Sequence, residues 1–253
     1  MEIHKTALID KSVILGKNIV IGPFTQIVGR VEISDNVKIA SNCVVGAEAD
    51  QPRLERRGSG EGKIIIGEGT TIKDGVIISK PTLTDHTTIG SDCYLMSNAY
   101  IAHDCTLDNK VVISHGARLS GYTNIGRYSN IGAGAVTHQK TSIGECVMVG
   151  ANSFVKGNLL SGLIYVQNNK IIGINNESLE PSFIDDDQIA TYYFTDSDVG
   201  FVTSIITDGS QGQEQQGQVV VGPRGTKLHF KIRSTAELQT SNYLFNTLGS
   251  AGN

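Results

Sequence analysis

Aliphatic residues recur at every sixth position along most of the first 155 residues of the chain. Of 23 such positions, 22 hold Ile, Leu or Val, and Thr137 is the exception. The positions are Ile3, Ile9, Leu15, Ile21, Ile27, Ile33, Ile39 and Val45, then Ile66, Ile72 and Ile78, then Ile89, Leu95, Ile101, Leu107, Ile113, Leu119, Ile125, Ile131, Thr137, Ile143, Val149 and Val155. A six-residue period is typical of a parallel β-helix, in which each hexad supplies one short strand with its aliphatic side chain pointing inward. Three hexads close one triangular coil, so the pattern predicts roughly seven to eight coils stacked at the spacing of paired strands.

Two polar stretches interrupt the period and predict excursions from the coils. The first, at about residues 48–63, includes Arg53 and is too hydrophilic for a core. The second, at about residues 79–88, ends shortly before the coil that contains His103. Because loops carry function where a rigid scaffold aims them at a site, the second excursion is a candidate part of one.

The six-residue period stops after Val155. Patches rich in β-branched and aromatic residues follow (ATYYF, GFVTSIIT, QVVVG and KLHFKI), separated by polar segments. The predicted fold class is therefore all-β: a parallel β-helix over residues 1–157, a connecting segment over 158–183, and a small C-terminal β-rich appendage over 184–253.

Composition excludes several classes of protein. The 21 Lys and Arg against 25 Asp and Glu give a net charge of -4, so nucleic acid is not an expected partner. No stretch approaches the ~20 apolar residues of a membrane span, and the N-terminal residues lack the layout of a secretory signal, so we expect a cytoplasmic protein. The four cysteines form no C-x-x-C pair and are expected to be reduced packing residues.

Stacked coils bring residues 18 apart into columns, and one corner of the predicted prism gathers reactive side chains. One column holds Asp85, His103, Gly121 and Gln139, and the adjacent column holds His86, Asp104, Tyr122 and Lys140. His103 is expected to point outward, where its imidazole would accept a proton from an alcohol that attacks a thioester. The backbone N–H of Gly121 would suit the developing oxyanion, and Asp104 would orient the imidazole. The alternative from these residues alone is an ordinary hydrated corner.

The segment NAYIAHDCTLDN at 98–109 resembles the segment that holds the catalytic histidine of the acyl-carrier-protein-dependent UDP-N-acetylglucosamine O-acyltransferases, the first enzymes of lipid A synthesis. The resemblance extends over residues 1–179, through GYTNIG, THQKTSIG and VMVGANS to GINNESL. It implies a left-handed β-helix and a homotrimer with active sites between neighbouring prisms. It also implies acyl-carrier protein and a nucleotide sugar as partners.

The resemblance further implies a role for each matching residue. His103 would be the general base, Asp104 its supporting carboxylate, and the amide of Gly121 the oxyanion donor. Gln139 would contact the acyl chain or donor, with His138 beside it in the donor cleft, and Asn175 and Glu177 would contact the nucleotide sugar. Arg53 matches the family in the first excursion, and Ala151 stands where a glycine opens the groove for long acyl chains, which favours shorter ones. The remaining substrate-binding candidates, Tyr100 and Tyr122, replace histidines of the family.

The chain departs from the family in two further places. Pro181 and Ser182 stand where the family carries a pair of arginines that bind the nucleotide. The family ends in a helical domain, whereas a β-rich tail is predicted here. Both departures weaken the expectation of nucleotide binding.

Three functions therefore stay open. The first is transfer of an acyl group from acyl-carrier protein to the 3-hydroxyl of UDP-N-acetylglucosamine. The second is an acetyl-CoA-dependent N-acetyltransferase acting on a nucleotide aminosugar. The third is a non-catalytic trimeric β-helix used as a spacer or as a virion or surface module. The thioester is a co-substrate in the first two, and no bound cofactor or metal is expected, because the six histidines lack the spacing of a zinc site between prisms.

Overall fold

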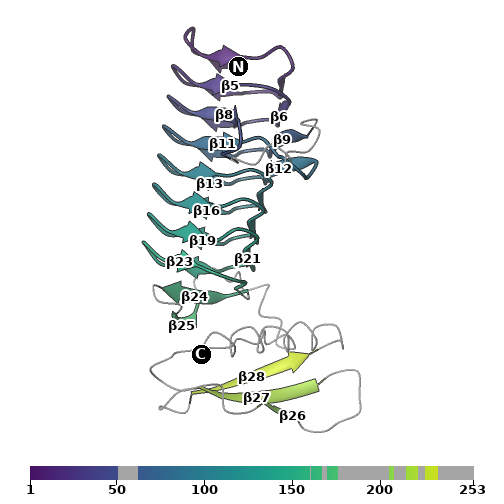
Figure 1. Cartoon of the computed structure of the whole chain (residues 1–253), viewed down its shortest axis with the longest axis vertical. Helices are drawn as coiled ribbons and strands as arrows, with labels where there is room; N and C mark the ends of the chain where they lie inside the picture. Colours follow the sequence, from purple (N-terminus) through teal and green to yellow (C-terminus); the bar gives the residue numbers. More distant parts are fainter. Residues whose placement is uncertain are drawn as a thin grey trace.

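The computed structural model describes residues 1–50, 62–159, 161–166 and 175, together with the backbone of 170–174, 205–207, 215–221 and 226–232. Figure 1 shows short strands stacked in successive coils from the N-terminus onward. The strands of these coils form three sheets that run along the stack, one on each side of the prism.

The first sheet has ten strands: β1 (Glu2–Ile3), β4 (Val20–Ile21), β7 (Lys38–Ile39), β10 (Thr71–Ile72), β13 (Tyr94–Leu95), β16 (Val112–Ile113), β19 (Asn130–Ile131), β22 (Met148–Val149), β24 (Leu163–Val166) and β25 (Lys170–Ile174). The second sheet has eight: β2 (Leu8–Ile9), β5 (Gln26–Ile27), β8 (Val44–Ala47), β11 (Ile77–Ser79), β14 (Tyr100–Ile101), β17 (Arg118–Leu119), β20 (Val136–Thr137) and β23 (Phe154–Val155). The third sheet has seven: β3 (Ile14–Leu15), β6 (Val31–Ile33), β9 (Lys63–Ile66), β12 (His86–Ile89), β15 (Thr106–Leu107), β18 (Asn124–Ile125) and β21 (Ser142–Ile143).

Strand pairing follows the predicted register. Ile3 pairs with Ile21, and Leu107 pairs with Ile125, in both cases 18 residues further along the chain. The two excursions lengthen the register locally, because Ile33 pairs with Ile66, and Ile66 with Ile89. The parallel β-helix predicted from the six-residue period is confirmed.

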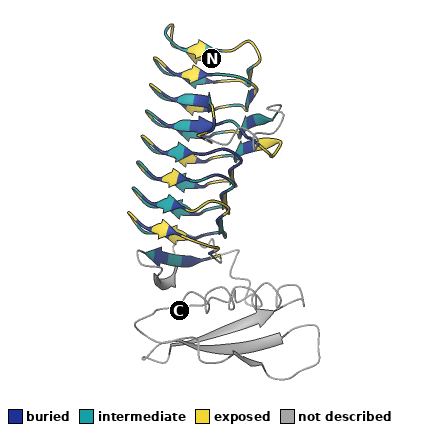
Figure 2. Cartoon of the chain, viewed as in Figure 1, coloured by how far each residue is buried: buried dark blue, intermediate teal, exposed yellow. Residues whose placement is uncertain are grey.

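The core consists of the inward residue of each strand. Ile27, Ile72 and Ile113 are completely buried, whereas their neighbours in the strands face outward. Figure 2 shows this alternation of buried and exposed positions along the stack. Burial of each such side chain contributes about 1.5–3 kcal/mol, so the regular period is a direct source of stability. All four cysteines are buried free thiols, and burial raises the pKa of Cys93 to about 11.

The first sheet continues past residue 157, where the sequence predicts the end of the β-helix. β24 pairs in parallel with β22, and β25 then pairs antiparallel with β24. Backbone pairing does not require the six-residue aliphatic period, and Leu163 and Tyr165 still point inward with at most 3% exposure.

Three strands are described within the predicted C-terminal appendage. β26 (Ile205–Thr207), β27 (Gln215–Val221) and β28 (Thr226–Ile232) form an antiparallel sheet. The predicted boundaries at 158, 183 and 184 stay predictions. Within the described part of the chain, no helix has the length and apolar character needed to cross a membrane.

Candidate active site

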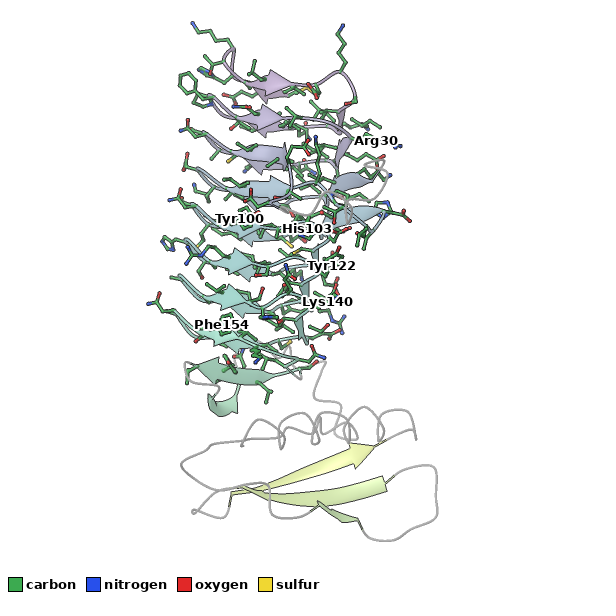
Figure 3. All side chains as sticks on the ribbon, viewed as in Figure 1. Arg30, Tyr100, His103, Tyr122, Lys140 and Phe154 are labelled. Atoms are coloured by element: carbon green, nitrogen blue, oxygen red, sulfur yellow. The ribbon has the colours of Figure 1, made fainter. Side chains whose placement is uncertain are left out.

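His103 and Asp104 lie in the corner between β14 of the second sheet and β15 of the third. Gly121 and Tyr122 occupy the same corner one coil further on, where the N–H of Tyr122 donates to the carbonyl of His103 at 3.1 Å. In Figure 3, His103, Tyr122 and Lys140 follow one another along one edge of the stack. The structure therefore brings these residues together in the order that the predicted columns give.

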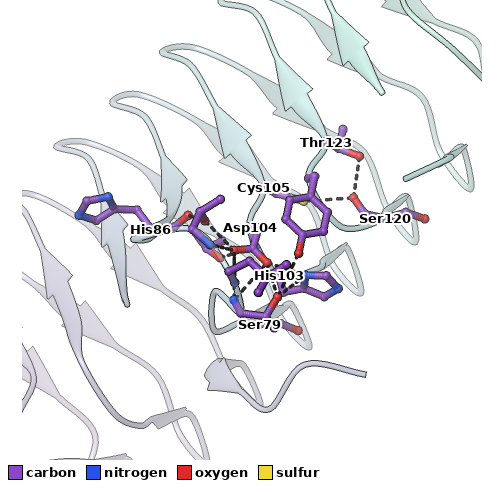
Figure 4. A network of polar contacts seen from close by, with 12 residues as sticks. Ser79, His86, His103, Asp104, Cys105, Ser120 and Thr123 are labelled. Carbon is purple, nitrogen blue, oxygen red and sulfur yellow. Dashed lines mark hydrogen bonds and ion pairs between the residues drawn. The ribbon is translucent and has the colours of Figure 1, made fainter. Parts of the chain in front are cut away.

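The columns do not continue to Asp85 and His86, contrary to the prediction. His86 begins β12, pairs with Lys63 and is exposed, and Figure 4 shows it directed away from His103. The second excursion adds residues before this strand, so the chain passes over the corner before its strand pairing resumes. The N–H of Asp104 donates to Thr87 Oγ1 at 2.9 Å.

Residues 80–85, which we call the arch, link β11 to β12 and cover this corner. Asp104 Oδ1 accepts from the N–H groups of Leu83 (3.1 Å) and Thr84 (2.7 Å) and from Thr84 Oγ1 (2.6 Å). Asp104 Oδ2 accepts from Thr82 Oγ1 (2.6 Å), and the N–H of Thr82 lies 3.0 and 3.1 Å from the two oxygens. Figure 4 shows this network around the carboxylate. A buried carboxylate with this many donors is a fixed negative charge.

The pKa of Asp104 reflects two opposing effects. Burial alone would raise it, but hydrogen bonds from His103, Thr82 and Thr84 outweigh burial and hold the pKa of this carboxyl well below its usual range. Asp104 is therefore ionised at neutral pH and acts only as a hydrogen-bond acceptor.

The ionised carboxylate sets the tautomer of His103. Nδ1 of His103 lies 2.7 Å from Asp104 Oδ2, so Nδ1 carries the proton and Nε2 keeps its lone pair when the ring is neutral. Thr82 Oγ1 lies 3.3 Å from the same Nδ1, and the Tyr122 ring meets the imidazole edge-to-face at a centroid distance of 5.2 Å. These contacts hold the imidazole in one orientation.

His103 lies outside the aliphatic interior, as predicted, but the arch leaves only 5% of the residue exposed. Sequence reasoning expected an outward side chain and did not foresee this cover. Among the described residues, the fully buried side-chain polar atoms without a partner are Thr141 Oγ1 and Ser153 Oγ. His103 Nε2 is not one of them, although no described residue hydrogen-bonds to it, so this atom keeps some contact with solvent.

Gly121 packs directly against the imidazole. A Cβ added to Gly121 would lie 2.5 Å from Cε1 and 2.8 Å from Nε2 of His103, closer than any real contact. A glycine is therefore needed here for close approach of the ring. The peptide that joins Ser120 to Gly121 is anchored from inside, because the Ser120 carbonyl accepts from Thr123 Oγ1 at 2.6 Å and from Cys105 Sγ at 3.3 Å.

This inward carbonyl directs the N–H of Gly121 outward, because the two groups of a trans peptide point in opposite directions. Four other corners show the same outward N–H. In each, a carbonyl accepts from an inward hydroxyl or thiol; these carbonyls belong to Ala40, Gly90, Asp108 and Gly144. The N–H group of the next residue then donates to a side-chain oxygen; these residues are Ser41, Ser91, Asn109 and Glu145. The N–H of Gly121 has no such acceptor among the described residues. Open N–H groups also occur elsewhere, but this one adjoins His103.

A corner N–H of this kind stabilises negative charge. The hydrogen bond from the N–H of Ser41 is the largest cause that lowers the pKa of Asp74 below its usual range. The equivalent N–H of Gly121 has no acceptor among the described residues, although the glycine itself is buried, so the corner places an uncapped backbone donor beside the imidazole of His103.

Of the two tyrosines that replace histidines of the family, Tyr122 joins this network and Tyr100 makes separate contacts. Tyr122 OH lies 3.3 Å from Thr82 Oγ1. Tyr100 OH lies 3.3 Å from Ser79 Oγ and donates to Asp50 Oδ2 at 3.2 Å. Burial and the charge of Asp50 raise the pKa of Tyr100, although the contact with Ser79 opposes them.

Sequence reasoning missed the threonines of the arch. Thr82 and Thr84 have no place in the columns, because the excursion that contains them lies outside the 18-residue register. The composition of the excursion could have indicated them, because three of the six residues at 82–87 are threonines, close in sequence to the coil of His103. Short hydroxyl side chains are suited to bind a carboxylate from a loop.

The other residues predicted to contact the acyl donor are exposed and belong to later coils than His103. Gln139 stacks one coil beyond Gly121, since the N–H of Lys140 donates to the Gly121 carbonyl at 3.0 Å. His138 Nδ1 lies 3.1 Å from the Gln139 carbonyl, and its ring meets Phe154 edge-to-face. Ala151 is exposed two corners further along the chain. Gln139 and His138 are therefore exposed along the same edge as His103, whereas Ala151 lies at a different edge, between the first and second sheets.

Asn175, one of the two predicted nucleotide-sugar residues, is not brought to His103 within one chain. Asn175 is buried, and its Nδ2 donates to the carbonyl of Cys146, which lies in a corner between the third and first sheets. Glu177 and Arg53 lie outside the described residues. In the described ranges, no group of three or more His, Cys, Asp or Glu side chains could hold a metal ion.

Comparison with known proteins supports the resemblance. The family model of the bacterial transferase hexapeptide matches residues 3–47 and 86–121. A curated acyl-[acyl-carrier-protein]–UDP-N-acetylglucosamine O-acyltransferase from Rhizobium rhizogenes is 31% identical over 172 residues, which are 62% of this chain and 60% of that protein. One from Campylobacter concisus is 28% identical over 155 residues, 60% of this chain and 58% of that protein. The chain is therefore similar to these O-acyltransferases over its hexapeptide repeats.

Solved structures agree with this assignment. LpxA from Acinetobacter baumannii matches with a TM-score of 0.57 and 26% identity, over 70% of this chain and 73% of that one. LpxA from Moraxella catarrhalis matches with a TM-score of 0.56 and 26% identity, over 73% and 80%. The left-handed parallel β-helix implied by the resemblance is confirmed. The chain spans about three fifths of the length of the curated relatives it matches.

Proposed function

We propose that this chain transfers an acyl group from acyl-carrier protein to the 3-hydroxyl of UDP-N-acetylglucosamine, with His103 as general base. The observation that carries this proposal is the pairing of His103 Nδ1 with the ionised Asp104 at 2.7 Å while Nε2 lies against Gly121. The printed names of the relatives give the same donor and acceptor for those proteins.

The reaction needs a base, an oxyanion donor and a proton for the leaving group. Nε2 of His103 takes the proton of the sugar hydroxyl as its oxygen attacks the thioester carbonyl. Asp104 stabilises the imidazolium through Nδ1, an arrangement that contributes typically 10²–10⁴-fold in rate. The N–H of Gly121 donates to the tetrahedral oxyanion. When the C–S bond breaks, the imidazolium returns its proton to the thiolate, which leaves the acyl ester and the free thiol.

We propose further that the chain forms a homotrimer in which a neighbouring prism covers the second sheet. The outward residues of this sheet are mostly apolar, whereas those of the third sheet are mostly polar. On the second sheet they include Leu8, Val44, Ile77, Tyr100, Val136 and Phe154. Leu8 is 63% and Phe154 49% exposed. Gln26 and Arg118 interrupt this apolar face. A largely apolar face of this kind marks a protein interface, and the His103 corner lies at its edge.

The acyl donor is proposed to carry a short chain. Ala151 is exposed in a corner between the first and second sheets, and its methyl group occupies space that a glycine would leave open. Donors with short acyl chains should be turned over faster than donors with long ones. In Ala151→Gly, the ratio of long-chain to short-chain turnover should rise roughly tenfold, which corresponds to the binding energy of about one to two methylene groups. Equal turnover of all chain lengths by both forms would contradict this step.

Direct assay tests the proposed function. The purified full chain is incubated with UDP-N-acetylglucosamine and a panel of acyl-carrier-protein and acyl-CoA donors, and the product is identified by mass spectrometry. An O-acyl product, cleaved by mild alkali, is expected. His103→Ala should lower its rate at least about 100-fold. His115→Ala is the matched control, because His115 is an exposed corner histidine at another edge of the prism.

Other outcomes separate the remaining functions. An alkali-stable amide formed on an aminosugar nucleotide, with little loss in His103→Ala, would indicate an N-acetyltransferase, because an amine needs a base less than a hydroxyl does. No product from any donor with His103 intact would favour a structural module and would overturn the proposal.

A further inference from the structure

Thr137 is the one non-aliphatic residue among the 23 positions of the six-residue period, and the strand pairing changes beside it. β17 and β20 pair only through Arg118 and Val136, whereas neighbouring strands of the second sheet pair through two residues. The N–H of Ser120 donates to Thr137 Oγ1 at 3.0 Å. At the equivalent positions on either side, the N–H groups of Ala102 and His138 donate to the backbone carbonyls of the paired strands. The hydroxyl of Thr137 therefore replaces a backbone acceptor directly before Gly121.

Thr123 also differs from its equivalents. Inward hydroxyls elsewhere bridge to the next coil: Thr25, Thr70 and Ser129 donate to the carbonyls of Ala40, Gly90 and Gly144. The hydroxyl of Thr123 instead turns back to the Ser120 carbonyl of its own corner, at 2.6 Å, and lies 2.8 Å from Thr137 Oγ1. The Ser120 carbonyl receives both this bond and the regular one from Cys105 Sγ.

We propose that Thr137 and Thr123 are positioning residues that fix the orientation of the Gly121 N–H for the acyl-transfer reaction. The two hydroxyls hold the N–H and the carbonyl of Ser120 from inside the prism, so both ends of this residue are fixed before the chain reaches Gly121. Both threonines are completely buried and bonded, which makes their positions rigid. Neither touches His103, so they act on the donor and not on the base. The proposal rests on the proposed function for its kinetic part only.

The physical alternative is that Thr137 merely fills the core. An aliphatic residue would serve that purpose better, because 22 of 23 equivalent positions hold one. With valine at this position, the N–H of Ser120 would return to the backbone carbonyl, as at Ala102 and His138. The fold would keep its register while the Ser120–Gly121 peptide would rotate.

Kinetics distinguish the two explanations. Thr137→Val and Thr123→Val should each lower kcat about tenfold with little change in KM, because a small misplacement of a catalytic donor affects the transition state and not substrate binding. The pH profile should stay that of the wild type, since His103 and Asp104 are untouched. Thr137→Ser, which keeps the hydroxyl, should recover most of the rate. Thr25→Val is the matched control, because it removes an equally buried hydroxyl bonded to a corner carbonyl at 2.6 Å elsewhere.

A second readout does not depend on activity. The sequence has three Ser–Gly pairs, at 59–60, 120–121 and 161–162, so carbonyl-labelled serine with ¹⁵N-glycine isolates three amide signals. Thr137→Val and Thr123→Val should shift the Gly121 signal and leave the other two in place, and Thr25→Val should shift none. An unmoved Gly121 signal, or a kcat of Thr137→Val within twofold of wild type, would overturn the proposal. An inactive wild type would contradict the proposed function, and the amide signals would still decide the positioning.

Discussion

The corners at Ser41 and at Gly121 both fix a carbonyl from inside the prism, by Thr25 of the preceding coil in one case and by Thr123 of the same corner in the other, but they end differently. In both, the preceding carbonyl accepts from a buried threonine hydroxyl at 2.6 Å, and the N–H that follows is directed outward. At Ser41 this N–H donates to Asp74 Oδ1 at 3.1 Å. At Gly121 no described residue accepts it, and the ring of His103 lies against the glycine instead.

The difference shows how one backbone feature serves stability in one coil and chemistry in another. Asp74 stacks on Ser41 from the next coil, and the corner N–H holds the pKa of its carboxyl below the usual range. Gln139 stacks on Gly121 in the same way, yet it leaves the N–H open. In these two corners, the residue contributed by the next coil therefore decides whether the N–H is capped or left without an acceptor.

Gly121→Ala should have the largest effect on the open corner. The added methyl would lie 2.5 Å from His103 Cε1, so the imidazole must leave its place beside the N–H. The rate should fall about 1,000-fold, since both base and oxyanion donor lose their alignment. Gly150→Ala, whose methyl would meet Val166 at 3.1 Å in another corner, should keep its rate within a few-fold. Equal losses in the two variants, measured under the same assay, would argue against a site at Gly121.

Asp104→Asn should have the next largest effect, a loss in the free energy of unfolding that depends on pH. The pKa of Asp104 is lower in the folded protein than the value of about 3.9 that Asp has in an unfolded chain. The ionised carboxylate therefore stabilises the fold fully when the pH is above about 3.9, and this contribution is lost as the pH falls through the folded pKa. The variant should lose about 3 kcal/mol at pH 7, and the difference should shrink below about pH 4. Urea unfolding at fixed protein concentration measures it, and a difference constant with pH would contradict the assignment.

Thr84→Val should weaken the arch more modestly. It removes the hydroxyl contacts with Asp104 Oδ1 (2.6 Å) and with the carbonyl of His86 (2.9 Å) but leaves the bond from the N–H of Thr84 in place. We expect a loss of about 1–2 kcal/mol in the free energy of unfolding and faster amide exchange in residues 82–84. Unchanged exchange would show that the hydroxyl does not hold the arch.

Asp74→Ala should have the smallest effect on stability and should affect only the corner at Ser41. It removes one exposed hydrogen bond to the N–H of Ser41, which is worth about 0.5–1.5 kcal/mol at most. Acyl transfer should be unaffected. A loss of activity comparable to that of Gly121→Ala would remove the distinction between the two corners.

The sequence was sufficient for the scaffold but not for the cover over the site. The six-residue period gave the coils, and the 18-residue columns placed His103, Gly121 and Gln139 correctly, because regular strand pairing repeats the same geometry. His86 was misplaced and Thr82 was missed, because an excursion has no register from which its path can be derived. The sequence shows Thr137 as the one exception to the aliphatic period. Only the structure shows that its hydroxyl accepts a hydrogen bond from the N–H of Ser120.

The contrast between Gln139→Asp and Gln139→Glu tests the open N–H of Gly121 most directly. Both variants add the same charge at the same place, but only aspartate has the length with which Asp74 caps Ser41. In single-turnover transfer from acyl-carrier protein to UDP-N-acetylglucosamine, Gln139→Asp should be about 100-fold slower than Gln139→Glu, because its carboxylate occupies the oxyanion donor. Equal rates for the two variants would show that the Gly121 N–H takes no part in the reaction.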